Sequence, residues 1–213
     1  MKGIFITFEG PDGSGKSTQI RKLAEYLQDR QWPIVLTREP GGTFIGDAIR
    51  HILLDPSYEA LGDETEALLY AASRAQHIKE VIMPALNEGK IVLCDRFVDA
   101  SIAYQGYGLE LPLDQVIAIN QFATHHLTPH RTYMLDIAPE IARARMLAQH
   151  GRGLDRIEQK HFAYHQRVRE GFLRIYKENI QRICLIDGAR PPEVVFEEIA
   201  HDASCFIKHK IEE

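Results

Sequence analysis

A glycine-rich segment near the N-terminus has the spacing of a phosphate-binding loop. Residues 10–17 read GPDGSGKS and fit the pattern GxxxxGK[ST]. The segment follows the apolar run Ile4–Phe8 and opens a predicted helix, which is the context that such a loop requires. Glycines let backbone N–H groups converge on phosphate oxygens, and the helix N-terminus adds a favourable dipole. We expect Lys16 to contact the β- and γ-phosphates of a nucleotide and Ser17 to bind Mg²⁺.

Charged residues end two further apolar runs. Arg38 begins the segment REPGGT after the second run, and Asp95-Arg96 ends the third. In open α/β sheets, ligands lie at the carboxyl edge of the strands. A carboxylate at that edge is suited to Mg²⁺, and arginines are suited to phosphate. The alternatives are a turn with an incidental surface arginine at Arg38 and a helix cap at Asp95.

Two stretches combine polar and aromatic side chains that could read a nucleoside. Tyr70 and Arg74 lie four residues apart in a helical pattern and therefore share a face. Ser101, Tyr104 and Gln105 lie in the sequence SIAYQGYG. Taken alone, the first pair is more typical of a core residue beside a surface salt bridge, and the second stretch fits a plain loop entrance as well as a nucleoside contact.

Composition sets limits on the class of protein. The chain has 213 residues, with 25 Lys and Arg against 30 Asp and Glu, and 45% of its residues are hydrophobic. This excludes intrinsic disorder, and the acidic balance argues against a nucleic-acid polymer as partner. No run approaches the roughly 20 apolar residues of a membrane span. Three widely spaced cysteines predict neither a disulfide framework nor a zinc site, and they fit a reducing, cytoplasmic compartment.

Short apolar runs alternate with longer helical patterns along the chain. Near-continuous apolar runs are typical of strands buried on both faces, so the pattern predicts an α/β fold with a parallel five-stranded sheet and helices on both faces. We expect one domain over residues 1–213, because no linker divides the chain. The predicted strands are 3–8, 33–37, 90–94, 131–136 and 182–186, and the predicted helices are 16–30, 43–54, 63–87, 113–126, 139–150, 155–179 and 191–209.

Together the motifs resemble those of the thymidylate kinase family. The shared segments follow the family order over nearly the whole chain: residues 8–17, 37–43, 68–77, 95–106, 154–158 and 186–191. The resemblance implies a P-loop nucleoside-monophosphate-kinase fold. It also implies a homodimer that uses ATP and Mg²⁺ to phosphorylate thymidine 5′-monophosphate to the diphosphate, for deoxythymidine triphosphate synthesis.

The resemblance also implies roles for individual residues on the acceptor and donor sides. The thymidylate side would comprise Arg38 and Arg96 at the phosphate, Tyr70 and Arg74 at the base, Asp12 at the 3′-hydroxyl, Tyr104 at the 2′ position, and Ser101 and Gln105 near base and sugar. The ATP side would comprise Gly10, Pro11, Asp12, Gly13, Ser14, Gly15, Lys16, Ser17 and Thr18, with Arg145 and Arg190 beside the adenine. Ser17 and Asp95 would bind the metal.

A mobile lid is implied around residues 149–157. Some family members carry an arginine at the position of Gly13, and others carry it in the lid. This chain has lid arginines and therefore resembles the bacterial lid-arginine type. The residues expected to be catalytic, because they neutralise charge on the transferring phosphoryl group, are Lys16, Arg96, Arg152 and Arg156.

Two positions depart from the family pattern. Tyr70 stands where phenylalanine is more usual, and Ser73 stands where an acidic residue is often found, which predicts a less firmly oriented Arg74. Two other functions stay open at this point. One is a kinase for another nucleoside monophosphate, and the other is a non-catalytic ATP-binding interaction module.

Overall fold

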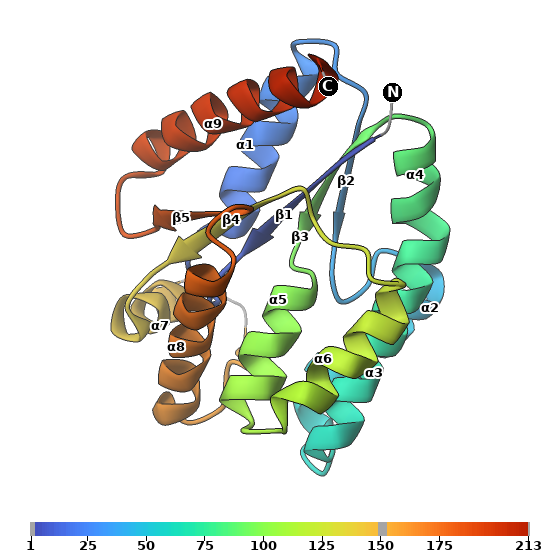
Figure 1. Ribbon diagram of the computed structural model, residues 1–213. Helices are drawn as coiled ribbons and strands as arrows, with labels where there is room; N and C mark the ends of the chain where they lie inside the picture. The colour runs from blue at the N-terminus through green and yellow to red at the C-terminus, as the bar shows by residue number, and fades with distance from the viewer. Residues whose placement is uncertain (1–2, 149–152, 213) are drawn as a thin grey trace.

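A five-stranded parallel sheet forms the centre of the molecule (Figure 1). The structure is a computed structural model, and it describes residues 3–148 and 153–212, with side chains up to 210. The strand order is β2-β3-β1-β4-β5, and every neighbouring pair is parallel. The predicted strands are confirmed to within one residue: β1 Ile4–Glu9, β2 Ile34–Arg38, β3 Ile91–Asp95, β4 Arg131–Asp136 and β5 Ile183–Asp187.

Helices cover both faces of this sheet, as predicted (Figure 1). One face packs against α1 and α9, and the other packs against η2, α4, η3 and α8. Alternate residues of β1 divide between the two sides: Ile6 and Phe8 join the first core, and Phe5 joins the second. The helices are α1 Lys16–Gln28, α2 Phe44–Leu54, α3 Asp63–His77, α4 Met83–Asn87, α5 Val98–Ser101, α6 Leu113–Thr124, α7 Pro139–Ala148, α8 Phe162–Glu178 and α9 Pro192–Glu212, with single turns η1 Pro56–Tyr58, η2 Ile78–Ile82 and η3 Ile102–Gly108.

The segment 98–108 is helical, which excludes the alternative that residues 101–108 form a plain loop. It consists of α5 followed by the π-helical turn η3. Packing against α8 explains the helix, because Tyr104 lies edge-on to Phe172 with ring centroids 5.9 Å apart. A side chain at Gly108 would meet the Tyr164 ring at 2.7 Å, so the two elements approach closely.

The expected helix over 155–179 begins only at Phe162, and residues 156–159 form turns. The Asp155 carboxylate accepts the backbone N–H groups of Ile157 (3.0 Å) and Glu158 (2.9 Å). Side-chain bonds of this kind compete with helical hydrogen bonds and favour a turn. Residues 149–152 of the predicted lid lie outside the described residues, so the lid and the single-domain organisation stay predictions.

Across residues 3–148 and 153–212, no helix is both long and apolar enough to cross a membrane.

Candidate active site

The phosphate loop wraps tightly between β1 and α1. Gly10, Gly13 and Gly15 all have positive φ, at 126°, 78° and 98°. At Gly13 a side chain is also excluded by space, because its Cβ would lie 2.6 Å from the carbonyl oxygen of Ala142 in α7. Glycine relieves both constraints. The loop is therefore held against α7 with its backbone N–H groups at the start of α1.

Lys16, the first residue of α1, folds back over this loop. Its Nζ donates to the carbonyl oxygens of Gly10 (3.0 Å) and Pro11 (2.8 Å). Burial, together with the nearby charge of Arg96, lowers the pKa of Lys16 to about 8. The ammonium is thus desolvated before any ligand arrives, which strengthens its attraction to a phosphate.

Ser17 and Asp95 lie together at the edge of the sheet. The Ser17 hydroxyl donates to Oδ2 of Asp95 over 2.8 Å, although 78 positions separate the two residues. A hydroxyl and a carboxylate are hard oxygen donors, which suit Mg²⁺. The donor set therefore fits the predicted metal role, and it lies beside the lysine of the phosphate loop.

Arg96 is the centre of a charged cluster. It donates to the carbonyl oxygen of Gly10 (2.9 Å), to Oδ1 of Asp12 (2.7 Å) and to the hydroxyl of Tyr104 (3.1 Å). That hydroxyl donates in turn to Oδ2 of Asp12 over 2.8 Å. Burial alone would raise the pKa of Asp12, but the charges of Arg96 and Lys16 outweigh it and hold that pKa well below its usual range. The cluster links the phosphate loop to η3.

Glu9 holds the backbone that presents Arg96, a role that the sequence interpretation missed. Arg96 has a positive φ of 73°. The next residue, Phe97, donates its backbone N–H to Oε1 of Glu9 over 2.7 Å. Complete burial, reinforced by the charge of Asp99, raises the pKa of Glu9 to about 8. The signal in the sequence was an acid at the carboxyl end of an apolar run.

Arg74 is buried and firmly oriented, so the expectation drawn from Ser73 was wrong. Glu39 supplies the carboxylate, accepting from Nε of Arg74 over 2.6 Å. The guanidinium also donates to the Ser101 hydroxyl (2.9 Å), the Asn120 side-chain oxygen and the Phe97 carbonyl oxygen (2.9 Å). These bonds occupy four of the five N–H groups of an arginine. One N–H is left for a ligand.

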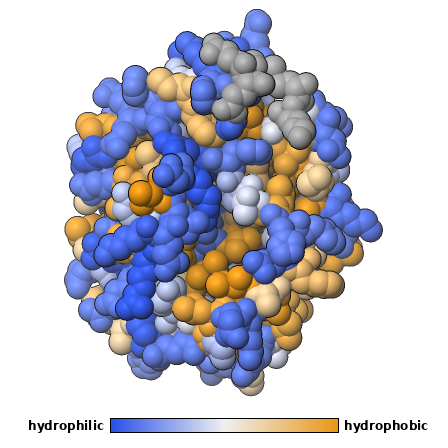
Figure 2. Space-filling view, viewed as in Figure 1, coloured by the Kyte–Doolittle hydropathy of each residue, from blue (hydrophilic) through white to orange (hydrophobic). Residues whose placement is uncertain are grey.

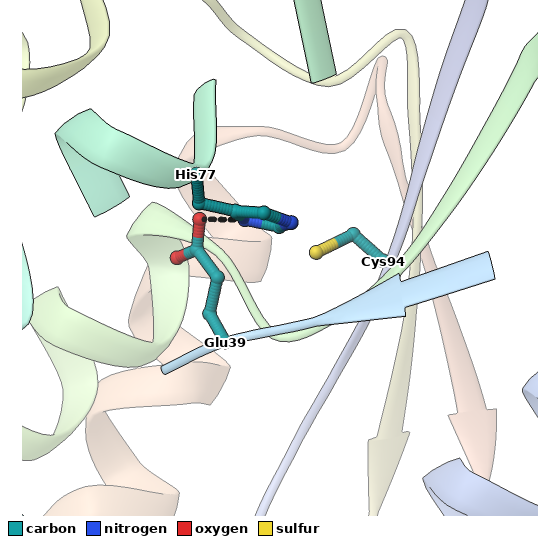
Figure 3. A group of neighbouring side chains, drawn as sticks. All are labelled: Glu39, His77 and Cys94. Carbon is teal, nitrogen blue, oxygen red and sulfur yellow. Dashed lines mark hydrogen bonds and ion pairs between the residues drawn. The ribbon is translucent and has the colours of Figure 1, made fainter. Parts of the chain in front are cut away.

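Glu39, His77 and Cys94 come close enough to suggest a buried metal site (Figure 3). Their donor atoms are already in use. Glu39 accepts from Arg74 and pairs with Nδ1 of His77 at 3.0 Å, and Nε2 of that ring bonds the Thr37 hydroxyl at 2.6 Å. Burial, reinforced by the charge of Glu39, raises the pKa of the Cys94 thiol, which keeps it protonated. Glu39 and His77 therefore form a hydrogen-bonded support for Arg74, whereas the Cys94 thiol donates to the carbonyl oxygen of Arg96 over 3.1 Å.

Two hollows meet at this centre. The acceptor cavity lies beside α3 and η3, and the donor cleft, of about 790 Å³, lies along the phosphate loop. They share Asp12, Glu39, Arg50, Arg96 and Asp155. Predicted residues of the acceptor cavity are Asp12, Tyr70, Arg74, Arg96, Ser101, Tyr104 and Gln105, and those of the donor cleft are Asp12, Gly13, Ser14, Gly15, Lys16, Ser17, Thr18, Arg38, Asp95, Arg96, Arg145 and Arg190.

The structure places two arginines differently from the sequence prediction. Arg38, predicted at the acceptor phosphate, is half exposed, lines the donor cleft and lies 3.4 Å from Asp47. Arg50 of α2, which the sequence reading missed, lines both hollows, and its guanidinium donates to the Pro40 carbonyl oxygen over 3.0 Å. Burial and the charge of Arg38 lower the pKa of Arg50. Arg50 thus lies where two phosphates would meet.

Two arginines lie at the far end of the donor cleft, where the adenine was expected. Arg145 donates to the Gly188 carbonyl oxygen over 2.9 Å, and Arg190 pairs with Glu198. The first contact ties α7 to the loop after β5, and the second ties that loop to α9.

Arg156 does not line either hollow, although its neighbour Asp155 lines both. It is buried, it donates to Oε2 of the fully buried Glu66 over 2.7 Å, and it donates from Nε to the Leu53 carbonyl oxygen over 2.9 Å. Its geometry is that of a structural anchor at the C-terminal end of the predicted lid. Arg152 lies outside the described residues, so the catalytic roles of both arginines stay predictions.

A phosphate loop, a cation-lined cleft and a second cavity that meets the cleft at Asp12 and Arg96 define a P-loop nucleotide kinase with adjoining donor and acceptor sites. The sequence profile described as "Thymidylate kinase" matches residues 8–199. The chain therefore belongs to the thymidylate kinase family, which confirms the resemblance of its motifs.

Relatives and a solved structure agree with this assignment. The thymidylate kinase of Exiguobacterium sibiricum is 50% identical over 210 residues, covering 99% of this chain and 98% of the relative. That of Bacillus anthracis is 47% identical over 199 residues, covering 93% and 96%. The crystal structure of thymidylate kinase from Ehrlichia chaffeensis matches with a TM-score of 0.77 at 33% identity, covering 95% of this chain and 99% of that one.

Proposed function

We propose that this chain transfers the γ-phosphoryl group of ATP to the 5′-phosphate of thymidylate, giving ADP and thymidine diphosphate, a step toward deoxythymidine triphosphate. The observation that carries the proposal is the junction at Asp12, Arg50 and Arg96, where the acceptor cavity opens into the donor cleft. Two nucleotides bound in these hollows would bring their phosphates together there.

The chemistry needs positioning and charge neutralisation. The acceptor phosphate is already an anion, so no base has to remove a proton from it. Lys16 would hold the β- and γ-phosphates, and Arg50 and Arg96 would hold the acceptor phosphate, because their guanidinium groups suit phosphate geometry. Ser17 and Asp95 would hold Mg²⁺, which neutralises charge on the donor phosphates when it is bound. Arg152 remains the candidate to cover the transferring group from the lid.

The acceptor cavity suits a deoxypyrimidine. Tyr70 offers a ring for stacking, and Arg74 offers one N–H to a base carbonyl. Asp12 and Tyr104 form a closed pair, with 2.8 Å between the hydroxyl and the carboxylate, beside the position expected for the sugar. Their contact supports a 3′-hydroxyl acceptor at Asp12 with little room for a 2′-hydroxyl beside Tyr104.

We further propose a cytoplasmic homodimer. Cys94, Cys184 and Cys205 are free thiols, which fits a reducing compartment. Hydrophobic side chains gather near the centre of the face in Figure 2, over α5 and α6. On α6, Phe122 is 84% exposed and Ile117 is partly exposed, which makes this helix the candidate dimer surface. Light scattering of the wild type and of Phe122→Ser tests this, with a shift toward the monomer expected for the variant.

The test of the reaction is one assay with four acceptors. Purified protein, ATP and Mg²⁺ are incubated with thymidylate, uridylate, cytidylate or guanylate, and ADP and the nucleoside diphosphate are quantified. Preferred use of thymidylate is expected. Preferred use of another acceptor would make the chain a kinase of that nucleotide. ATP binding without ADP formation for every acceptor would leave only a binding module.

A further inference from the structure

We propose that Glu66 is a positioning residue that sets the pyrimidine selectivity of the acceptor cavity by fixing which end of the Gln105 amide faces the base. The inference rests on the proposed function and deepens it. Glu66 lies on α3, one turn before Tyr70, and Gln105 lies on η3. Gln105 lines the acceptor cavity, whereas Glu66 is fully buried behind it.

Arg156, Glu66 and Gln105 form a chain of two hydrogen bonds, which we call the relay. In each bond the chemistry of the side chains determines which group is the donor and which is the acceptor. Arg156 donates to Oε2 of Glu66 over 2.7 Å, and Nε2 of Gln105 donates to Oε1 of Glu66 over 2.9 Å. An arginine has only donors and is always charged, so it holds Glu66 as a carboxylate. A carboxylate has only acceptors. The amide must therefore turn its NH₂ group toward Glu66, whichever way a free glutamine would prefer.

The opposite end of the amide follows from this. With Nε2 bound to Glu66, Gln105 presents its carbonyl Oε1 toward the cavity. Among the described residues, no side chain donates a hydrogen bond to this oxygen. Arg74 lines the same cavity with one N–H available. The residues lining the cavity thus include one donor, on Arg74, and one acceptor, on Gln105.

That pattern matches one class of pyrimidine. Thymine and uracil carry a carbonyl at position 4 and an N–H at position 3, so they accept from Arg74 and donate to Gln105. Cytosine carries an amino group at position 4 and an unprotonated nitrogen at position 3, so both contacts would be mismatched. A mismatched buried polar group costs more than a good bond gains, which makes such sites selective.

Replacing Glu66 by glutamine should reverse the relay. Arg156 still donates, so the new amide must turn its oxygen toward Arg156 and its NH₂ group toward Gln105. Gln105 must then turn its own oxygen inward and present NH₂ to the cavity. This arrangement suits the unprotonated nitrogen of cytosine and opposes the N–H of thymine.

The experiment measures kcat/KM for thymidylate, deoxyuridylate and deoxycytidylate in wild type and Glu66→Gln. We expect kcat/KM for thymidylate and deoxyuridylate to fall together by about tenfold, and that for deoxycytidylate to hold or rise. Equal loss for all three, with unchanged selectivity, would show a merely structural role and overturn the inference. Inactivity of the wild type on thymidylate would instead refute the proposed function.

Gln105→Met is the matched control variant, because methionine has no amide group that Glu66 could orient. Adding Glu66→Gln to Gln105→Met should leave the ratio of thymidylate to deoxycytidylate use unchanged, and a shift there would contradict the relay. Thermal melting and ATP binding report whether each variant is folded. If Glu66→Gln does not fold, the double variant Glu66→Gln with Arg156→Met replaces it, because it also removes the buried charge of Arg156. In that double variant the ratio of thymidylate to deoxycytidylate use should still fall, by less than tenfold. An unchanged ratio in that variant would also overturn the inference.

Discussion

Removing the Arg96 guanidinium should cost the protein stability through one partner only, Asp12. In Arg96→Met the Gly10 carbonyl oxygen still accepts from Lys16, and the Tyr104 hydroxyl still donates to Asp12. The carboxylate of Asp12 alone loses a charged hydrogen bond, of 2.7 Å. We therefore expect the free energy of unfolding to fall by about 2 kcal/mol. This is below the roughly 3–5 kcal/mol of a fully buried pair, because the two side chains are 14% and 31% exposed.

A double-mutant cycle with Asp12→Asn isolates this interaction. The single variants should each lose about 2 kcal/mol, and the double variant should lose about the same, because the second change removes the charge that the first left unpaired. Urea denaturation followed by circular dichroism measures all four proteins. Additive losses in the double variant, or a loss below about 0.5 kcal/mol in Arg96→Met, would refute the reasoning.

The pH dependence adds an independent check on the same pair. The pKa of Asp12 is held well below its ordinary 3.8 in the folded protein. The contribution to stability is therefore fully present above the unfolded pKa and is lost as the pH falls through the folded one. The difference between wild type and Arg96→Met should be constant from pH 5 to 7, below the pKa values of about 8 of Glu9 and Lys16, and toward lower pH it should shrink only in strong acid. In the same variant, turnover should fall by about 10²–10³.

Three more predictions concern other cations. Because the pKa of Lys16 is about 8, the free enzyme loses this proton as the pH rises through 8, and the Kd of ATP with Mg²⁺ should rise by up to tenfold per pH unit above that value, as measured by calorimetry. Arg50→Met should raise KM for thymidylate by about tenfold, because one charged hydrogen bond to the acceptor phosphate is lost, as measured by steady-state kinetics. Arg156→Met should lower the free energy of unfolding by about 3 kcal/mol, because it leaves the Glu66 carboxylate buried without its cation, as measured by urea denaturation.

The Lys16 and Arg50 predictions each have a control variant and a result that would contradict them. Lys16→Met should bind ATP weakly with no such pH dependence, and a flat profile in the wild type would contradict the lysine assignment. Arg30→Met changes a surface arginine after α1 and should leave KM unaltered; an unaltered KM in Arg50→Met as well would remove Arg50 from the site. Arg152→Met should lower kcat by about 10²–10⁵, and full turnover in both Arg152→Met and Arg156→Met would refute the lid-arginine prediction.

The sheet and the phosphate loop could be predicted from the sequence because their signals are local. Each strand is a short apolar run, and the loop is a fixed spacing of glycines followed by Lys16 and Ser17. Family motifs then gave the assignment of the remaining cavity residues. Arginine and aspartate at the end of a buried strand are informative about function, because folding alone seldom needs a guanidinium or a carboxylate there.

The supports of the site could not be predicted, because they are long-range pairs. Glu39 lies 35 residues from Arg74, and Glu66 lies 90 residues from Arg156. Arg156 was predicted as a lid arginine from its place in the sequence, although its partners are on α3 and at the end of α2. Arg50 was missed because an arginine within an amphipathic helix is indistinguishable from a solvated one until the fold brings both hollows to it.

The contact between Gly13 and α7 bears on how the two arrangements of the catalytic arginine could interconvert in evolution. A side chain at position 13 would meet the backbone of Ala142, and its φ of 78° would be strained as well. Acquiring a loop arginine therefore requires α7 to move first, and α7 also carries Arg145 and leads into the lid. Single substitutions at this position would pass through a poorly folded form. The backbone beside Gly13 would thus preserve the predicted lid arrangement, and a change to a loop arginine would need the helix and lid to change together.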